Sequence, residues 1–352
     1  MIAPRIDEVL RSITWPEPTG CPAGLGIGDS LITCAGFEDR ALAFLLQVAR
    51  AGASRFRVTG IKYLPSVPEN RLEELEDAAS RAGATLALLE YWRAEPVRTD
   101  EILATIRSAE RIFVDVSGMS RLLIVQLVAG LVRNGLLRRA SIVYSEAEHY
   151  PPSEEEVRKS LVEAPDLRGV LSFISSGVAD LTIVPELSTA AMQGQPMRVI
   201  AFPGFNAAQF ATICAEINAS AFTIINGVPP SPENRWRREA IRELNGIESV
   251  HDREEIDVST LDYRQTLRAI LDVYGRYGAT QKLIVAPTGS KMQSVGAGLA
   301  CGFLRDIQVV YPTPLTFPSP SRYTTGIRAT TCLSLAPFAA VAENRLQTPV
   351  DE

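Results

Sequence analysis

The sequence predicts an α/β fold: two tandem Rossmann-like three-layer sandwiches with mostly parallel sheets, arranged as an internal pseudo-dimer. Two observations lead to this class. Apolar runs of strand length alternate with segments of helix length, which is typical of parallel sheets with right-handed crossovers. The same succession of segments then occurs a second time in the chain, which indicates a tandem duplication.

The duplication rests on four pairs of segments that follow one another in the same order. The motif Pro-Glu-Asn-Arg occurs in both copies of one pair, and RIFVDVSGMSR in the first copy matches QKLIVAPTGSK in the second. The pairs, first copy over second, are 30–49 over 198–217, 65–78 over 229–243, 111–121 over 281–291, and 175–187 over 324–337.

The repeat also predicts the domain boundaries. An N-terminal extension covers 1–27, and it is expected to hold one short helix. The first Rossmann-like repeat covers 28–192, the second covers 193–345, and a short tail follows at 346–352. The glycines of the extension precede the first strand and lack the GxGxxG spacing, so they do not predict a dinucleotide site.

In the first copy, the elements follow from the apolar pattern. A strand at 31–35 ends at Gly-Phe and enters a helix, and a second strand at 55–60 leads through the Pro-Glu-Asn-Arg loop into an amphipathic helix. A third strand is expected at 84–91. The strand in RIFVDVSGMSR then turns on Ser-Gly into the apolar helix 122–132, and a further strand ends at Tyr144.

The second copy repeats this order with one weak element. Strands are expected at 198–202 and 221–226, whereas the equivalent of the third strand, near 248–251, has little apolar character. A strand ending at Tyr311 closes the copy. The acidic run 153–166 of the first copy predicts a solvated helix.

Composition limits the classes of function. The 352 residues carry 35 Lys and Arg against 41 Asp and Glu, a net charge of −6, which argues against an extended nucleic-acid coat surface. The two histidines and five scattered cysteines, none spaced as CxxC, predict no metal site and a reducing compartment. Neither a Walker motif nor another cofactor motif is present, so no cofactor is expected.

The hydropathy pattern predicts no contact with a membrane. The N-terminal segment carries charges where a signal peptide needs an apolar core. The longest uncharged apolar run, 122–132, is about half of the length that spans a bilayer. These observations predict a cytoplasmic protein.

The candidate site lies at the carboxyl ends of the parallel strands, because ligands of open α/β sheets bind at that edge. Three elements of each copy reach this edge: the Gly-Phe turn, the Pro-Glu-Asn-Arg loop and the Ser-Gly or Thr-Gly turn. Glycine lets the backbone approach a ligand, hydroxyls donate to phosphate oxygens, and a cation at a helix start adds charge. The expected ligand-binding residues of the Ser-Gly and Thr-Gly turns are Ser117, Gly118, Ser120, Arg121, Thr288, Gly289, Ser290 and Lys291. The expected rim consists of Arg40, Asn70, Arg71, Asn206, Asn234 and Arg235.

Each of these motifs has a structural alternative. Ser120 and Ser290 are also good helix N-caps, and Pro-Glu at a helix start is a common capping signal. Catalytic candidates are weak: they are Glu38, Asp39 and Asp115, and the second copy has Asn206-Ala207 and Ala286 in their places. Loss of these acids makes duplicated catalysis improbable, although one active half stays open.

A strand followed by [ST]-G-x-[ST]-[KR] and a small-residue helix resembles the CRISPR-associated Rossmann-fold (CARF) sensors. Two such units in one chain also resemble their SAVED relatives in anti-phage signalling. Ser117, Gly118, Ser120 and Arg121 match the pattern, whereas the second copy matches at Ser290 and Lys291 and departs from it at Pro287-Thr288. In that family the domain binds cyclic or linear oligoadenylates and switches an effector.

Three functions follow in order of preference. The first is a nucleotide-sensing or regulatory protein that binds a phosphate-bearing, cyclic oligonucleotide-like ligand and controls a separate effector subunit, because no effector domain is visible in the sequence. The second is a nucleotide-processing phosphodiesterase or ring nuclease with one active half. The third is a non-catalytic scaffold subunit of a defence complex.

Overall fold

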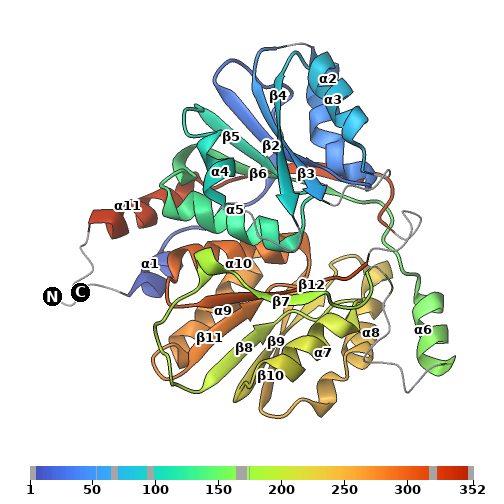
Figure 1. Cartoon of the computed structure of the whole chain (residues 1–352), viewed down its shortest axis with the longest axis vertical. Helices are drawn as coiled ribbons and strands as arrows, with labels where there is room; N and C mark the ends of the chain where they lie inside the picture. The colour runs from blue at the N-terminus through green and yellow to red at the C-terminus, as the bar shows by residue number, and fades with distance from the viewer. Residues whose placement is uncertain are drawn as a thin grey trace. The chain divides into compact units, whose positions relative to one another are not determined.

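The chain folds into two mostly parallel sheets, one of seven strands and one of six, with helices between successive strands (Figure 1). The computed structural model describes residues 5–52, 54–64, 70–92, 99–163, 173, 175–316 and 323–347. The chain divides into two compact units: the first comprises 1–120, 130–150 and 323–352, and the second 121–129 and 151–322. The predicted fold class is confirmed.

The seven-stranded sheet belongs to the first unit and has the strand order β1-β13-β6-β5-β2-β3-β4. Its parallel strands are β2 (Asp29–Ala35), β3 (Arg57–Leu64), β4 (Thr85–Trp92), β5 (Arg111–Asp115) and β6 (Ala140–Glu146), and its antiparallel strands are β13 (Ala329–Ser334) and β1 (Thr19–Gly20). The helices that follow these strands or flank them are α1 (Ile6–Ser12), α2 (Ala43–Ala51), α3 (Leu72–Arg81), α4 (Thr99–Ala104), α5 (Arg121–Arg133) and α11 (Ala339–Gln347).

The six-stranded sheet belongs to the second unit and has the order β10-β9-β8-β11-β12-β7. Its parallel strands are β8 (Met197–Ala201), β9 (Ala221–Val228), β10 (Arg253–Ser259), β11 (Lys282–Ala286) and β12 (Gln308–Thr313), and β7 (Asp180–Ile183) is antiparallel. The helices of this part of the chain are α6 (Glu154–Glu163), α7 (Ala207–Glu216), α8 (Trp236–Leu244), α9 (Tyr263–Tyr277) and α10 (Lys291–Phe303).

Apolar residues at the expected periods form the cores. In the first unit, Leu31 of β2, Phe44 of α2 and Leu75 of α3 are fully buried in one cluster, so both helices cover the same face of the sheet (Figure 1). In the second unit, Val199 of β8 and Phe210 of α7 share a cluster. The burial of these alternating strand residues is the main stabilising term of each sheet.

The last strand of each predicted copy pairs with the sheet that the other copy forms. Strand β7, which the sequence places before residue 192, pairs antiparallel with β12, and β13 pairs antiparallel with β6. The compact units therefore differ from the contiguous ranges 28–192 and 193–345, which remain a prediction about the duplication. Periodicity reports only that a segment is a strand, whereas pairing depends on contacts between distant segments.

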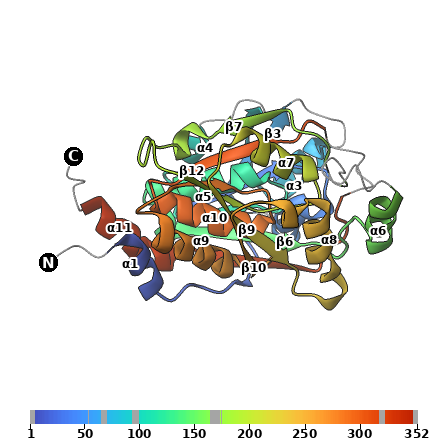
Figure 2. The same ribbon diagram turned by 90° about the horizontal axis from the view of Figure 1, so that it is seen from below.

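The N-terminal extension contains the predicted short helix, α1, and one element that the sequence did not predict. Strand β1 adds to the outer edge of β13, with Thr19 opposite Cys332. Helices α1 and α11, from the two ends of the chain, lie side by side (Figure 2).

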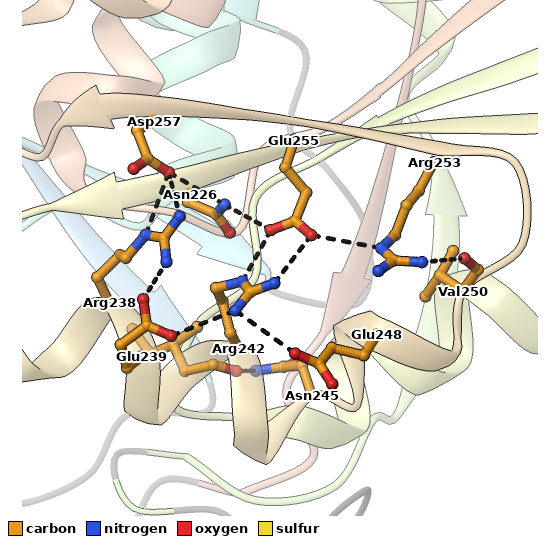
Figure 3. Close-up of polar contacts among 11 residues, drawn as sticks. Asn226, Arg238, Glu239, Arg242, Asn245, Glu248, Val250, Arg253, Glu255 and Asp257 are labelled. Carbon is orange, nitrogen blue, oxygen red and sulfur yellow. Dashed lines mark hydrogen bonds and ion pairs between the residues drawn. The ribbon is translucent and has the colours of Figure 1, made fainter.

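The predicted third strand of the second copy was misplaced. The structure has a 3-10 turn at Ile247–Ser249, and the edge strand β10 follows it at Arg253–Ser259. The apolar pattern did not predict β10, because this strand contains charged residues. They belong to an ion-pair network with α8 (Figure 3). Arg242 of α8 pairs with Glu255 at 2.8 Å, and Arg238 pairs with Asp257 at 3.0 Å. Charges on an exposed edge strand also oppose pairing with other chains.

Replacing Glu255 by glutamine is expected to lower the free energy of unfolding by about 1–2 kcal/mol at pH 7. The hydrogen bonds from Arg242 lower the pKa of Glu255 to about 2, and burial only partly opposes them. Because this pKa lies below that of the unfolded chain, the contribution is present above about pH 4.5 and is lost as the pH falls toward 2. Urea unfolding of both proteins between pH 7 and pH 3 measures the difference.

The control variant for this prediction is Glu239→Gln, whose side chain is 64% exposed although it pairs with the same Arg242. Its cost should stay below about 0.5 kcal/mol. A difference between the wild type and Glu255→Gln that stays constant from pH 7 to pH 3 would contradict the assignment.

Candidate functional site

The candidate turns meet at the same point of each sheet. In both sheets the first strand of the copy lies in the middle: β2 lies between β3 and β5, and β8 lies between β9 and β11. The order in which the chain adds strands to the sheet therefore reverses at β2/β5 and at β8/β11. Turns at such a switch point leave toward opposite faces, and ligands of open α/β sheets bind between them. The predicted Gly-Phe and Ser-Gly or Thr-Gly turns occupy these positions.

In the first unit the two turns approach at backbone distance. A Cβ atom on Gly36 would lie 3.6 Å from the carbonyl oxygen of Gly118, and a Cβ atom on Gly118 would lie 2.8 Å from both Ala41 Cβ and Cys34 Sγ. Glycine at 118 is therefore required for close packing of the two turns. In the second unit, Gly204 and the carbonyl of Thr288 are neighbours in the same way, at 3.4 Å from a Cβ on Gly204.

The turn after β5 is held by its own side chains. Asp115 and Ser117 are fully buried, and Asp115 Oδ1 accepts hydrogen bonds from the Ser117 amide (3.0 Å) and hydroxyl. The Ser117 hydroxyl in turn accepts a hydrogen bond from the Ser145 amide of β6 at 2.8 Å. These contacts give Asp115 and Ser117 a structural role that links the turn to β6.

Ser120 and Arg121 start α5 at the end of this turn and are partly exposed. The Ser120 amide donates to the Tyr63 hydroxyl at 2.7 Å. Burial raises the pKa of Tyr63 well above its usual value, so this hydroxyl stays neutral. Arg121 clusters with the second unit and donates from Nε to the carbonyl oxygen of Gly289.

The rim candidates of the first unit are joined by ion pairs. Arg40 is buried and pairs with Glu38 at 3.1 Å, and it also donates to the Tyr144 hydroxyl at 3.1 Å. Burial by itself would lower the pKa of Arg40, but the Glu38 carboxylate raises it above its ordinary value, so Arg40 remains charged. The more exposed Arg71 pairs with Glu74 and lies 3.5 Å from Asp39. The acids Glu38 and Asp39 are thus both paired with arginines.

Asn70 differs from its counterpart in the second copy. It is buried next to the Gly36 turn, where the Arg71 amide donates to the Gly36 carbonyl oxygen at 3.4 Å, and within the described residues its amide group has no hydrogen-bond partner. Asn234 is half-buried, donates to the Ser231 hydroxyl at 3.0 Å, and accepts from Arg237 at 2.8 Å. The asparagines of the two Pro-Glu-Asn-Arg motifs are therefore not equivalent, and Pro68 and Glu69 of the first motif lie outside the described residues.

The turn after β11 is organised as a helix N-terminus. Ser290 and Gln293 form a capping box, in which Gln293 N donates to Ser290 Oγ at 3.1 Å and Ser290 N donates to Gln293 Oε1 at 2.7 Å. The Thr288 hydroxyl donates to the Phe202 carbonyl oxygen at 2.6 Å, and Thr288 is buried. A Cβ on Gly289 would overlap Gln293 Oε1, so glycine is needed there.

The remaining candidates of the second unit divide into buried and exposed residues. Asn206 is buried and donates to the Ser175 hydroxyl at 2.9 Å. Arg235 is exposed at the start of α8, and Lys291 is half-exposed at the start of α10. Lys291 and Arg235 are thus, like Arg121, cationic candidates that are not buried.

Sequence reasoning missed two residues that position the turns. Tyr63 at the end of β3 holds the Ser120 amide, and Gln293 completes the capping box of α10. Gln293 had a detectable signal, because Ser-x-x-Gln before an apolar run is a capping box pattern. Tyr63 had none, because only the folded sheet brings the ends of β3 and β5 to one edge.

Among the described residues, no three His, Cys, Asp or Glu side chains lie together in a group that could hold a metal ion. Across the same residues, no helix is both long enough and apolar enough to cross a bilayer.

No protein-family model matches the sequence, and no curated protein matches it. Solved structures resemble the chain at low similarity. A universal stress protein from Archaeoglobus fulgidus DSM 4304 is 11% identical over 82% of this chain and 97% of its own, with a TM-score of 0.24. The cytoplasmic domain of a prokaryotic cation chloride cotransporter is 7% identical over 90% and 98%, with a TM-score of 0.24. A type III CRISPR defence DNA nuclease activated by cyclic oligoadenylate is 9% identical over 77% of this chain and 64% of its own, with a TM-score of 0.43.

Proposed function

We propose that the chain is a sensing or regulatory protein of the CARF/SAVED-like type, which binds a phosphate-bearing, cyclic oligonucleotide-like ligand and controls a separate effector in anti-phage defence. The observation that carries the proposal is the repeated switch point. In both sheets a glycine-containing turn meets a second glycine turn and leads into a helix N-terminus with a cation beside it.

Burial and hydrogen bonding support a smaller set of ligand contacts in this proposal. Ser117 and Thr288 are buried and use their hydroxyl protons within the protein, so we assign them to the support of the turns. Phosphate contacts would come from the backbone at Gly118 and Gly289 and from the partly exposed cations Arg121 and Lys291. Ser120, which precedes α5, would add a hydroxyl contact, whereas the Ser290 hydroxyl donates to the Thr260 carbonyl oxygen at 2.5 Å and supports its own turn.

The hydrogen bonds and ion pairs of the three candidate acids favour binding over catalysis. Asp115 is fully buried and accepts hydrogen bonds from its own turn, while Glu38 and Asp39 are paired with arginines. A general base needs a carboxylate that reaches the substrate's proton. The hydrogen bonds and ion pairs of these three carboxylates support a structural role for them in this proposal.

The proposal is tested by thermal unfolding of the protein with cyclic oligoadenylates, cyclic dinucleotides, ATP and inorganic phosphate. A ligand at a hundredfold excess over its Kd adds about 2.7 kcal/mol to the free energy of unfolding. We therefore expect at least one nucleotide to raise the Tm by about 4 °C or more. The double variant Arg121→Ala/Lys291→Ala should lose this rise.

The matched control is Arg50→Ala/Arg305→Ala, which removes one exposed arginine from each unit away from the turns. It should keep the full shift. No shift with any nucleotide would overturn the sensor proposal and would favour a scaffold, and conversion of the nucleotide that stops in Asp39→Ala would favour an enzyme.

A further inference from the structure

Two cysteines from opposite ends of the sequence meet on the first unit. Strand β1 pairs antiparallel with β13, with Thr19 opposite Cys332 and Gly20 opposite Thr331. Cys21 follows directly, and in an antiparallel pair the residue two positions from Thr19 lies on the same face as Cys332. Cys332 belongs to the core cluster of the unit, and Cys21 packs against that cluster.

We propose that Cys21 and Cys332 form a peroxide-sensitive dithiol pair, whose oxidation to a disulfide locks the N-terminal segment onto the seven-stranded sheet. Both thiols are free in the structure. The inference is independent of the proposed ligand site, because it concerns only β1, β13 and their flanking residues.

The surroundings of the pair divide the roles of the two sulfurs. The hydrogen bond from Cys21 lowers the pKa of Cys332, and Ser141 and the Arg111 guanidinium act in the same direction against the effect of burial. The same hydrogen bond raises the pKa of Cys21. In the proposal, Cys332 therefore acts as the nucleophile, and Cys21 is the thiol that resolves the intermediate.

Access to the Cys21–Cys332 pair depends on β1, the shortest strand described in this sheet. Cys332 is 8% exposed, whereas Cys21 is partly exposed. The covering strand β1 has only two residues, Thr19 and Gly20, and both are exposed. So short an edge strand opens at low free-energy cost, which admits a small oxidant such as hydrogen peroxide.

The reaction balances with hydrogen peroxide as the two-electron oxidant. The Cys332 thiolate attacks one peroxide oxygen, the O–O bond breaks, and the released hydroxide takes a proton to become water. Cys21 then loses its proton and attacks the sulfur of the Cys332 sulfenic acid, the S–O bond breaks, and a second water leaves. Two thiols and one peroxide thus give one disulfide and two waters.

The disulfide would change the hold on the N-terminal segment. In the reduced protein, β1 is attached through a two-residue ladder and the packing of Cys21. A covalent bond at this point removes the open states of β1 and restricts the unfolded chain. The exposed thiol Cys214 on α7 provides the matched control, since it lies outside the pair and in the other unit.

The experiment uses full-length reduced protein treated with stoichiometric hydrogen peroxide at pH 7.5. Remaining thiols are blocked with N-ethylmaleimide, and peptides are mapped by mass spectrometry without reduction. We expect an intramolecular Cys21–Cys332 peptide pair in the wild type and in Cys214→Ser. In Cys21→Ser, Cys332 should instead be trapped by dimedone as its sulfenic acid. Oxidation should also raise the Tm by about 3 °C or more and slow hydrogen exchange at Thr19 and Gly20, both reversed by dithiothreitol.

The proposal is overturned if Cys21 and Cys332 both carry N-ethylmaleimide after a treatment that oxidises Cys214, or if Cys332 is found only in links between molecules. A Cys21–Cys332 disulfide that leaves exchange at Thr19 and Gly20 unchanged would overturn the locking of the segment. The wild-type map and the Cys21→Ser variant decide the outcome even if Cys332→Ser fails to fold.

Discussion

Replacing Arg40 by methionine is expected to lower the free energy of unfolding by about 3–5 kcal/mol. The Arg40 side chain is 6% exposed and that of its partner Glu38 is 13% exposed, so the substitution leaves a carboxylate in a desolvated place without its cation. It also removes the hydrogen bond to Tyr144 and the placement of the guanidinium over the Tyr144 and Tyr150 rings, 5.7 Å from each centroid. Urea unfolding at pH 7 measures the loss.

Arg71→Met is the control for Arg40→Met, because both arginines belong to the predicted rim and both pair with acids. The partners of Arg71, Asp39 and Glu74, are 53% and 54% exposed, so its loss should cost less than about 1 kcal/mol. The double variant Glu38→Gln/Arg40→Met should recover part of the cost of Arg40→Met, since it removes the unpaired charge. Equal costs for Arg40→Met and Arg71→Met would show that Arg40 has no special structural role.

Replacing Gly296 by alanine is expected to destabilise the second unit by about 2–3 kcal/mol, although alanine is the better helix former. Gly296 lies within α10 where this helix packs on α9. A Cβ atom there would stand 2.5 Å from the Tyr263 carbonyl oxygen and 3.1 Å from the Leu267 amide nitrogen. These are backbone atoms of α9, so relief of the overlap requires the helices to separate. Thermal and urea unfolding measure the effect.

The matched control is Gly130→Ala in α5. A Cβ atom on Gly130 would stand 2.8 Å from Leu103 Cδ1, the end of a flexible side chain that can rotate away. The gain in helix propensity, up to about 1 kcal/mol, then offsets the cost, and we expect little net change. A stabilised Gly296→Ala protein would mean that α9 and α10 pack less closely than the structure has them.

Local patterns in the sequence predicted most strands close to their observed positions. The first strands of the two copies were expected at 31–35 and 198–202, and they lie at Asp29–Ala35 and Met197–Ala201. The third strand of the first copy was expected at 84–91 and lies at Thr85–Trp92. These strands are rich in apolar residues over the length of a strand, so the local sequence alone identifies them.

Elements that depend on distant partners could not be predicted in the same way. The sequence did not predict strand β10 at its position, because its acidic residues pair with arginines of α8 and a local pattern does not report such contacts. The sequence also did not predict that β7 and β13 each pair with the sheet of the other copy, because a short strand of either copy can pair with either sheet edge. The placement of Cys21 near Cys332 arises only when β1 adds to β13, with Thr19 opposite Cys332.

For the candidate site, the sequence determined which segments form the turns and that they occur twice, because glycine, hydroxyl and cationic residues recur in order after apolar strands. Only the tertiary structure decided which side chains are available. Ser117, Asp115 and Thr288 match a binding motif by type, yet each is buried and bonded within its own unit. Residue type specifies what a side chain can bond to, whereas burial and the neighbouring strands specify what it does bond to. That difference leaves Arg121 and Lys291, which are partly exposed, and the glycine backbone beside them as the residues on which the proposed ligand site chiefly depends.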